Sequence, residues 1–356
     1  MGNKKIVRVD EIDIAKGLGI LLVIVGHLLP EDSWARQIIY SFHMPLFMIL
    51  SGMVISDKKE SKLSNNIKKE SNLIIAYLFW SVFYILFDFF IKFLFIRMID
   101  IEKIIADIYQ MCTLYGISVL WFISTLFISK IITKYINSVF NVYPYKKAVI
   151  AILLFGSSLF LRMRLVELYE EVKGFLNYII YFPMLAVLRS IAMTGFVLLG
   201  TCFKPYFQYI QKNFSSIKIL MCVGGGTAII LVSVNLRLKI NFDYHYLEVG
   251  NGISAYALAI IGFLCIGAFS SFISLFDNKV KTALCYLGKN SLFIMATHEY
   301  LLLKELVDLL INIKNPFLEK LLEVVALILI EVLLCKFVGK YYNQLLIWIK
   351  YVYPLN

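Results

Sequence analysis

Long apolar segments separated by short polar ones run through almost the whole sequence. Most of the apolar segments approach the roughly 20 residues that a helix needs to cross a bilayer. The polar interruptions are rich in Lys, Asn, Ser or Pro, as in residues 57–71 and 204–216. The pattern predicts about ten transmembrane helices. The expected spans are residues 12–30, 38–56, 73–96, 117–134, 148–162, 183–203, 218–236, 252–273, 284–303 and 318–338.

The composition agrees with this pattern, because 60% of the 356 residues are hydrophobic and only 17% are charged. Such values exclude an ordinary soluble protein. No charged tract is long enough for a separate soluble domain. We therefore predict an all-α, polytopic integral membrane helical bundle that forms a single domain over residues 1–356. The stretch 102–111 and the tail 341–356 mix aromatic and charged residues, which is typical of helices that lie along the membrane surface.

The net charge of +11 is spread over short loops beside apolar runs, so we interpret it as a membrane-topology signal and expect no nucleic-acid partner. If the N-terminus is cytoplasmic, most of the 35 basic residues fall on the cytoplasmic side. Both termini are then predicted to be cytoplasmic, although Arg162, Arg164, Arg237 and Lys239 fall on the outer side. The first apolar run has charged residues within it and no small-residue cleavage site after it, so we expect a retained span.

The six cysteines are scattered and form no CxxC pair, so the sequence predicts neither a disulfide nor a metal site. Each is expected to be a small buried hydrophobic residue.

The segment 9–56 is chemically the most informative, because polar residues interrupt its two apolar runs. Asp13, Lys16, His27 and His43 lie in or beside them. Polar groups in a span are costly and usually face a protein interior or a pathway. Lys16 and His27 are three helical turns apart on nearly the same face, separated by about 16 Å at 1.5 Å per residue.

These residues belong to motifs that resemble a known family. The motifs are a basic residue, ten others and His at 16–27; SFHMPLF from Ser41 and LSG from Leu50; LWFISTLFI from Leu120; and LGKNSLFIMATH from Leu287. Together they resemble the membrane-bound acyltransferase type 3 family, and within it the fucose 4-O-acetylase-like carbohydrate O-acetyltransferases. The resemblance covers nearly the whole chain.

The resemblance implies an enzyme of the cell (plasma) membrane that transfers an acetyl group from acetyl-CoA to a hydroxyl of a cell-surface polysaccharide or lipid-linked sugar. Membrane lipids, acetyl-CoA and the glycan are the expected partners. The alternative is a transporter or flippase for a lipid-linked sugar, whose polar residues would line a pathway. Pathway residues should recur along the membrane depth, whereas catalytic residues should cluster. With the predicted topology all four histidines fall in the outer half, which favours a catalytic site.

By the same resemblance, His27 is the expected catalytic base. Histidine suits this role because its ordinary pKa near 6.5 allows proton uptake and release near neutral pH. His43, His298 and Arg189 are candidate supporting or acceptor-binding residues, and His245 is expected to be a loop residue. The candidates to bind an oxyanion are Trp121, Asn290 and Ser291.

Donor binding is assigned to Asp13, Lys16, Lys68 and Lys69, with Lys289 as an assisting cation. The family commonly has arginines before the third span, where this chain has lysines at 68 and 69. Lysine offers a point charge in place of a bidentate fork. The structural alternatives are a plain Asp13–Lys16 ion pair, and histidines bonded to backbone carbonyls.

Overall fold

The structure is a computed structural model. It describes residues 10–55, 63–95, 97, 100–139, 143–171, 175–213, 217–238, 242–250, 252–299, 307 and 315–352. The two chain ends, on which the predicted orientation depends, and the last residues of the expected span 284–303 lie outside these ranges. The predicted topology therefore stays a prediction.

The regular elements of the described residues are helical, which confirms the all-α prediction. They are α1 (Asp10–Leu28), α2 (Trp34–Tyr40), α3 (His43–Met53), α4 (Leu63–Phe95), α5 (Ile101–Cys112), the 3₁₀ turn η1 (Ser118–Leu120), α6 (Trp121–Val139), α7 (Pro144–Glu171), α8 (Phe175–Asn213), α9 (Ile217–Leu238), α10 (Ile253–Ser274), α11 (Lys279–Lys289), α12 (Ser291–Thr297), α14 (Pro316–Phe337) and α15 (Gly339–Val352). The short stretch 102–111 and the tail both form helices, α5 and α15.

Within the described ranges, six helical segments are long and apolar enough to cross a membrane. They are Ser64–Phe95, Ser118–Ser138, Pro144–Tyr169, Ile179–Pro205, Ile217–Leu238 and Ile253–Ser274. They coincide with six of the expected spans. The remaining expected spans are shorter, broken or richer in charge in the part of the chain that the structure describes, so the predicted total of about ten is not confirmed.

Two expected spans are broken helices. The stretch 38–56 divides between α2 and α3 at Ser41, and 284–303 divides between α11 and α12 at Asn290. The hydroxyl of Tyr244 donates to the carbonyl of Ser41 at 3.0 Å. This bond provides a partner for a backbone group released by the break, as a buried carbonyl requires. At the second break, the side-chain amide of Asn290 donates to the carbonyl of Tyr286 at 2.9 Å.

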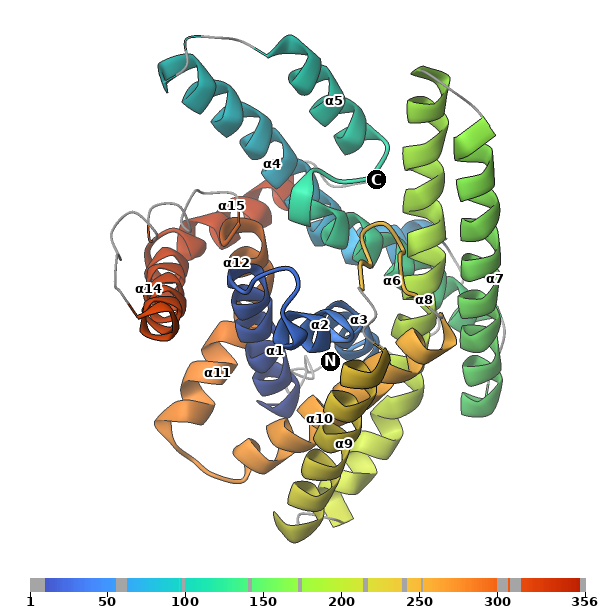
Figure 1. The fold of residues 1–356 in the computed structure, drawn as a ribbon, viewed down its shortest axis with the longest axis vertical. Coiled ribbons are helices and arrows are strands. Elements are labelled where there is room, and N and C mark those ends of the chain that lie inside the picture. The colour runs from blue at the N-terminus through green and yellow to red at the C-terminus, as the bar shows by residue number, and fades with distance from the viewer. Residues whose placement is uncertain are drawn as a thin grey trace.

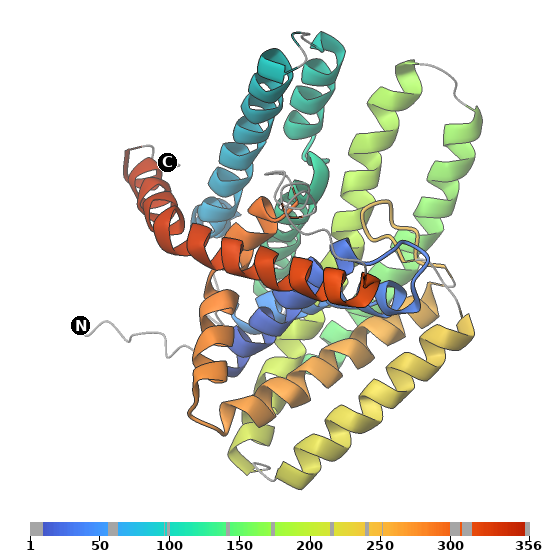
Figure 2. The same cartoon turned by 60° about the vertical axis from the view of Figure 1, so that its left-hand side comes forward.

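Helix α1 lies at the centre of the bundle, with α10, α11 and α12 around it, and α14 crosses beside it (Figures 1 and 2). The approach of α1 to α11 is close because two glycines face it. A Cβ atom at Gly17 would overlap the carbonyl of Leu284, and one at Gly288 would overlap the carbonyl of Asp13. This contact holds α12 near the C-terminal end of α1.

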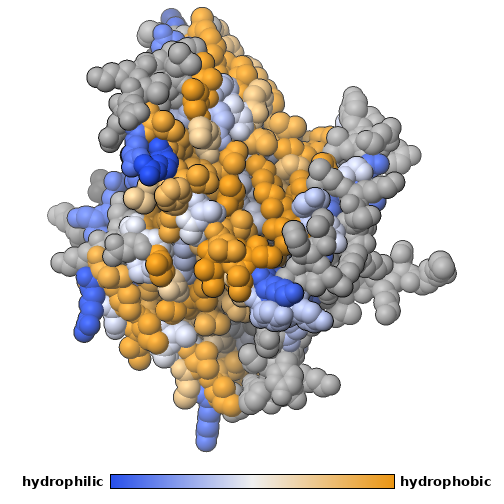
Figure 3. All heavy atoms as spheres, turned by 90° about the vertical axis from the view of Figure 1, so that its right-hand side faces the viewer, coloured by the Kyte–Doolittle hydropathy of each residue, from blue (hydrophilic) through white to orange (hydrophobic). Residues whose placement is uncertain are grey.

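The outside of the bundle is hydrophobic. Figure 3 shows apolar residues over most of the described surface on the side that carries α7 and α8. On α7, Ile152, Leu153 and Met163 are each about two-thirds exposed, at 65%, 65% and 66%. Apolar patches of this extent mark contact with a membrane or a partner. The composition and the long apolar helices identify that contact as lipid.

Candidate active site

Four histidines from four parts of the chain line one cavity of about 250 Å³. His27 is in the last turn of α1, His43 begins α3, His298 caps the end of α12, and His245 lies in the loop before α10. The rings of His27 and His298 are 5.1 Å apart, centroid to centroid. The cavity therefore brings together the histidine that ends the first motif and the histidine that ends the last one.

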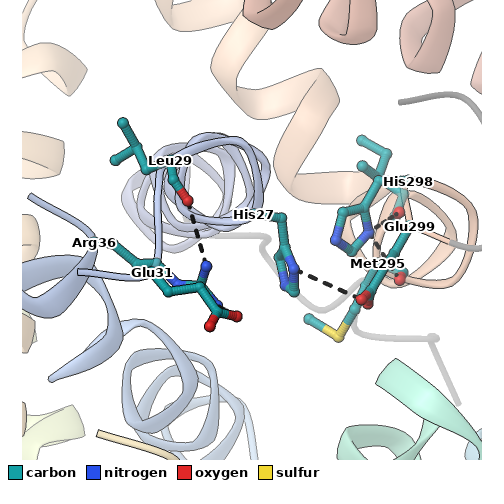
Figure 4. Close-up of polar contacts among 8 residues, drawn as sticks. His27, Leu29, Glu31, Arg36, Met295, His298 and Glu299 are labelled. Carbon is teal, nitrogen blue, oxygen red and sulfur yellow. Dashed lines mark hydrogen bonds and ion pairs between the residues drawn. The ribbon is translucent and has the colours of Figure 1, made fainter. Parts of the chain in front are cut away.

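Glu299 provides a carboxylate beside His27. Its Oε1 lies 3.8 Å from Nδ1 of His27, and Figure 4 shows the two side chains facing one another between α1 and α12. This distance is longer than a hydrogen bond, but catalytic contacts often tighten only when substrate binds. A carboxylate at Nδ1 fixes the tautomer in which Nε2 can accept a proton, and it stabilises the imidazolium that forms. The sequence alone did not identify this partner.

The rings of His298 and His43 are oriented by backbone carbonyls. Nδ1 of His298 lies 3.0 Å from the carbonyls of both Ile294 and Met295, and Nδ1 of His43 lies 2.9 Å from that of Ile39. A carbonyl can only accept, so both Nδ1 atoms carry the proton and both Nε2 atoms carry the lone pair. These bonds match the structural alternative considered for His43. They also leave Nε2 of His298 as an acceptor.

Arg36 and Tyr40 of α2 form the wall beside His27. The guanidinium of Arg36 lies 4.8 Å from the centre of the Tyr40 ring and donates to the carbonyl of Leu29 at 3.3 Å. The Tyr40 ring lies between His27 and His43, with centroids 6.0 and 4.8 Å away. The cavity thus combines a cation with aromatic faces, and both can contact a polar ligand.

Trp121 and His245 form a further wall of the cavity as a stacked pair. Their rings are 5.5 Å apart and inclined by only 6°. Burial, with the nearby charge of Arg189, lowers the pKa of His245 from 6.5 to about 2. His245 is therefore neutral at physiological pH, and it is more than the simple loop residue that the sequence predicts, because its ring lines the cavity.

Arg189 supports this wall from behind. Its side chain is fully buried and does not line the cavity. It donates to the carbonyls of His245 at 3.0 Å and Tyr115 at 2.7 Å, and to Oγ1 of Thr125 at 2.9 Å. Its guanidinium also lies 4.8 Å from the Trp121 ring centre. These contacts make it a positioning residue for the loop, in a place where the sequence suggested contact with the acceptor.

The loop that carries His245 is fixed by its own turn. Oδ1 of Asp243 accepts from the backbone amides of His245 at 2.8 Å and Tyr246 at 3.2 Å. The backbones of Asp243 and Glu248 exchange two bonds of 2.8 Å, and Leu247 adopts a left-handed φ of 56° to close the turn. This geometry holds the His245 ring against Trp121.

The other predicted site residues lie away from the cavity. Asn290 and Ser291 form the break between α11 and α12 and are absent from the cavity wall. Asp13 is buried near the N-terminal end of α1, and Lys16 follows about one turn later, about 16 Å from His27 by helix rise. Lys68, Lys69 and Lys289 are exposed. A donor site made of these residues would therefore be remote from the cavity.

Sequence reasoning missed Arg36, Tyr40, Asp243 and Glu299 as cavity residues. Glu299 directly follows His298, and this His-Glu pair at the end of an apolar run was an available signal. Arg36 and Tyr40 lie between two apolar runs, where charged and aromatic residues are ordinary. Only the fold shows that they face the cavity.

In the described part of the chain, His27, His298 and Glu299 each present one possible metal-ligand atom, and these atoms all lie within 4.8 Å of one another. None of the six cysteines takes part, and none forms a disulfide. Four of them are buried as expected, but Cys112 and Cys222 are exposed, so that expectation is wrong for these two.

Comparison with known proteins gives a family assignment. Residues 9–337 match the family described as an acyltransferase domain, so the match extends over nearly the whole chain. No curated protein and no solved structure gives a significant match.

Proposed function

We propose, from the premise that this chain belongs to the acyltransferase 3 family, that it is an integral membrane O-acetyltransferase. In this proposal acetyl-CoA is the donor, and a hydroxyl of a cell-surface polysaccharide or lipid-linked sugar is the acceptor. One observation carries the proposal most strongly. The family's first motif ends in a histidine that lies in a cavity with a carboxylate beside its Nδ1.

In this reaction, His27 acts as the general base. Its Nε2 removes the proton from the acceptor hydroxyl as the oxygen attacks the thioester carbonyl, while Glu299 stabilises the imidazolium through Nδ1. The oxygen–carbon bond forms, the carbon–sulfur bond breaks, and the proton passes from His27 to the leaving thiolate of CoA. A neutral imidazole suits a site among aromatic rings because it carries no charge before the reaction.

The oxyanion of the tetrahedral intermediate requires hydrogen-bond donors. Of the cavity residues, the Trp121 indole and the Arg36 guanidinium can donate without accepting. Arg36 lies beside Tyr40 and His27 in the same wall. Asn290 and Ser291 are less suitable, since neither lines the cavity.

Clustering of the polar residues supports an enzyme over a transporter or flippase. The four histidines line one cavity, whereas a translocation pathway would distribute polar residues along the membrane depth. In this proposal, acetyl-CoA approaches from the cytoplasmic side of the membrane and the acceptor from the outer side. Lys16 and Asp13 would then lie near the CoA end, and the pantetheine arm would extend along α1 towards His27.

Mass spectrometry of surface glycans tests the proposal. Glycans from cells that carry the gene, from deletion cells, and from deletion cells complemented with the wild type or with His27→Ala are compared. Acetyl groups should be lost on deletion and restored only by the wild type. Equal acetyl content in all four samples would overturn the proposed activity.

A further inference from the structure

We propose that His27, His298 and Glu299 form a binding site for a divalent transition metal ion of the Zn²⁺ type. Two imidazoles and one carboxylate are a ligand set that proteins use for Zn²⁺, with a fourth position left for water. The sequence predicts no metal site, because its cysteines are scattered and these three ligands come from α1 and from the residues directly after α12, far apart in the chain. The fold brings them together at one side of the cavity.

The distances suit a site that closes on the ion. The three ligand atoms lie within 4.8 Å of one another, and the pair of His27 Nδ1 and Glu299 Oε1 is already at 3.8 Å. Bond lengths of 2.0–2.1 Å in a tetrahedral site place ligand atoms about 3.4 Å apart. The side chain of Glu299 is 40% exposed, so a rotamer change can bring its carboxylate closer.

His298 provides independent support. Its ring is buried, with the residue only 2% exposed, and no hydrogen-bond partner among the described residues reaches its Nε2. Nδ1 donates to two backbone carbonyls, so Nε2 is the nitrogen that can bind a metal. Histidines that bind metals usually donate their other ring N–H to a carbonyl or carboxylate in this way. A bound ion would satisfy a buried lone pair that is otherwise costly.

The neighbouring charges balance each other. Arg36 and Asp243 line the same cavity, and their opposite charges cancel. The negative charge of Glu299 is then not offset, and it attracts a cation. A bound ion would take up the lone pairs of both histidines. If His27 is the base, as in the proposed function, the metal-loaded protein cannot transfer acetyl, and Zn²⁺ acts as an inhibitor.

Metal titration of the purified full-length protein tests the site. The protein is stripped with a chelator and titrated with Co²⁺, whose visible absorption reports its ligands, and Zn²⁺ is then added as a competitor. We expect one ion per chain at this site, with affinity reduced at least tenfold in Glu299→Gln and in His298→Gln. His245→Gln is the matched control, because it removes another cavity histidine that is outside the ligand set.

Glu299→Gln is a conservative substitution at a partly exposed side chain, so we expect this variant to fold. It therefore provides the test if His298→Gln does not fold. Wild-type affinity in Glu299→Gln, or equal weakening in His245→Gln, would overturn the site. An activity assay with Zn²⁺ separates this inference from the proposed function. Tight binding at these residues without inhibition would uphold the metal site and contradict His27 as the base.

Discussion

Nδ1 of His27 faces Oε1 of Glu299 at 3.8 Å, across the junction between the first helix of the bundle and the short helix α12. The two residues are far apart in the chain, and the close approach of α1 and α11 at Gly17 and Gly288 brings them together. In the proposed reaction, Glu299 is the carboxylate that orients the His27 base.

Replacing this carboxylate should slow turnover while substrate binding persists. We expect Glu299→Gln to lower kcat by roughly 10²-fold with little change in KM, since the carboxylate acts mainly on the charge that develops on His27. Steady-state kinetics of the purified variant measures both constants. Glu31→Gln is the control, because Glu31 is 92% exposed and its contact with Arg36 is screened by water. An unchanged kcat in Glu299→Gln would show that His27 needs no such partner.

Lys16 should act on the donor and not on the chemical step. We expect Lys16→Ala to raise KM for acetyl-CoA and leave kcat nearly constant, because a contact with the CoA phosphates is equally strong in the ground and transition states. Direct binding of acetyl-CoA should weaken in parallel. Lys340→Ala removes an exposed lysine elsewhere and should change neither quantity. A fall in kcat alone would place Lys16 at the reacting atoms.

The contact between α1 and α11 should not tolerate a methyl group. A Cβ at position 288 would overlap the Asp13 carbonyl, so we expect Gly288→Ala to destabilise the protein by about 1–3 kcal/mol. Gly225 is a helical glycine with open space around it, and Gly225→Ala should be neutral or slightly stabilising. Thermal unfolding in detergent compares the two. Equal stability of both variants would show that α1 and α11 are not closely packed.

Acid should destabilise the fold through His245. Burial, with Arg189, lowers the pKa of its ring from 6.5 to about 2, so between these values the unfolded chain binds a proton that the folded chain does not. The contribution of His245 to the free energy of unfolding is therefore fully present above about pH 7. Below this pH it falls by at most about 1.4 kcal/mol per pH unit. The neighbouring groups are Arg189, Asp243 and Tyr115.

Unfolding temperatures at pH 7 and pH 5 provide the measurement. The fall in unfolding temperature from pH 7 to pH 5 should be smaller in His245→Gln than in the wild type. Any effect of the substitution on packing is the same at both pH values, so it cancels in this difference. Arg189 binds the backbone carbonyl at this position, so the substitution keeps that bond. An identical loss in both proteins would assign the acid sensitivity to other groups.

The long apolar helices were predictable, because a helix exposed to lipid must be apolar along its length and this is visible in the local sequence. Six predicted spans correspond to helices in the structure. The break at Ser41 was not predictable from local sequence. Tyr244 and Asn235, both distant in the chain, contact Ser41 there, at 3.0 and 3.5 Å. The break at Asn290 had a local signal, since Asn side chains compete with the helix backbone.

Of the residues that line the cavity, His27, His43, His298 and Trp121 were candidates from the sequence, whereas His245 was expected to be only a loop residue. Motif position identified His27, and depth in the predicted topology placed all four histidines on one side. The role of Arg189 was not predictable, because a buried arginine bonded to three oxygens looks the same in sequence as one that contacts a ligand. Arg36 and Glu299 belong to the cavity only through tertiary contacts between segments that the sequence separates.

The most direct test of the account is acetyl transfer by purified protein in lipid nanodiscs, with radiolabelled acetyl-CoA and glycan extracted from cells that lack the gene. The wild type should label the glycan. His27→Ala should fold, insert and bind acetyl-CoA normally, yet lose at least about 10²-fold in labelling rate. Labelling by His27→Ala at the wild-type rate would contradict the assignment of this cavity as the site of transfer.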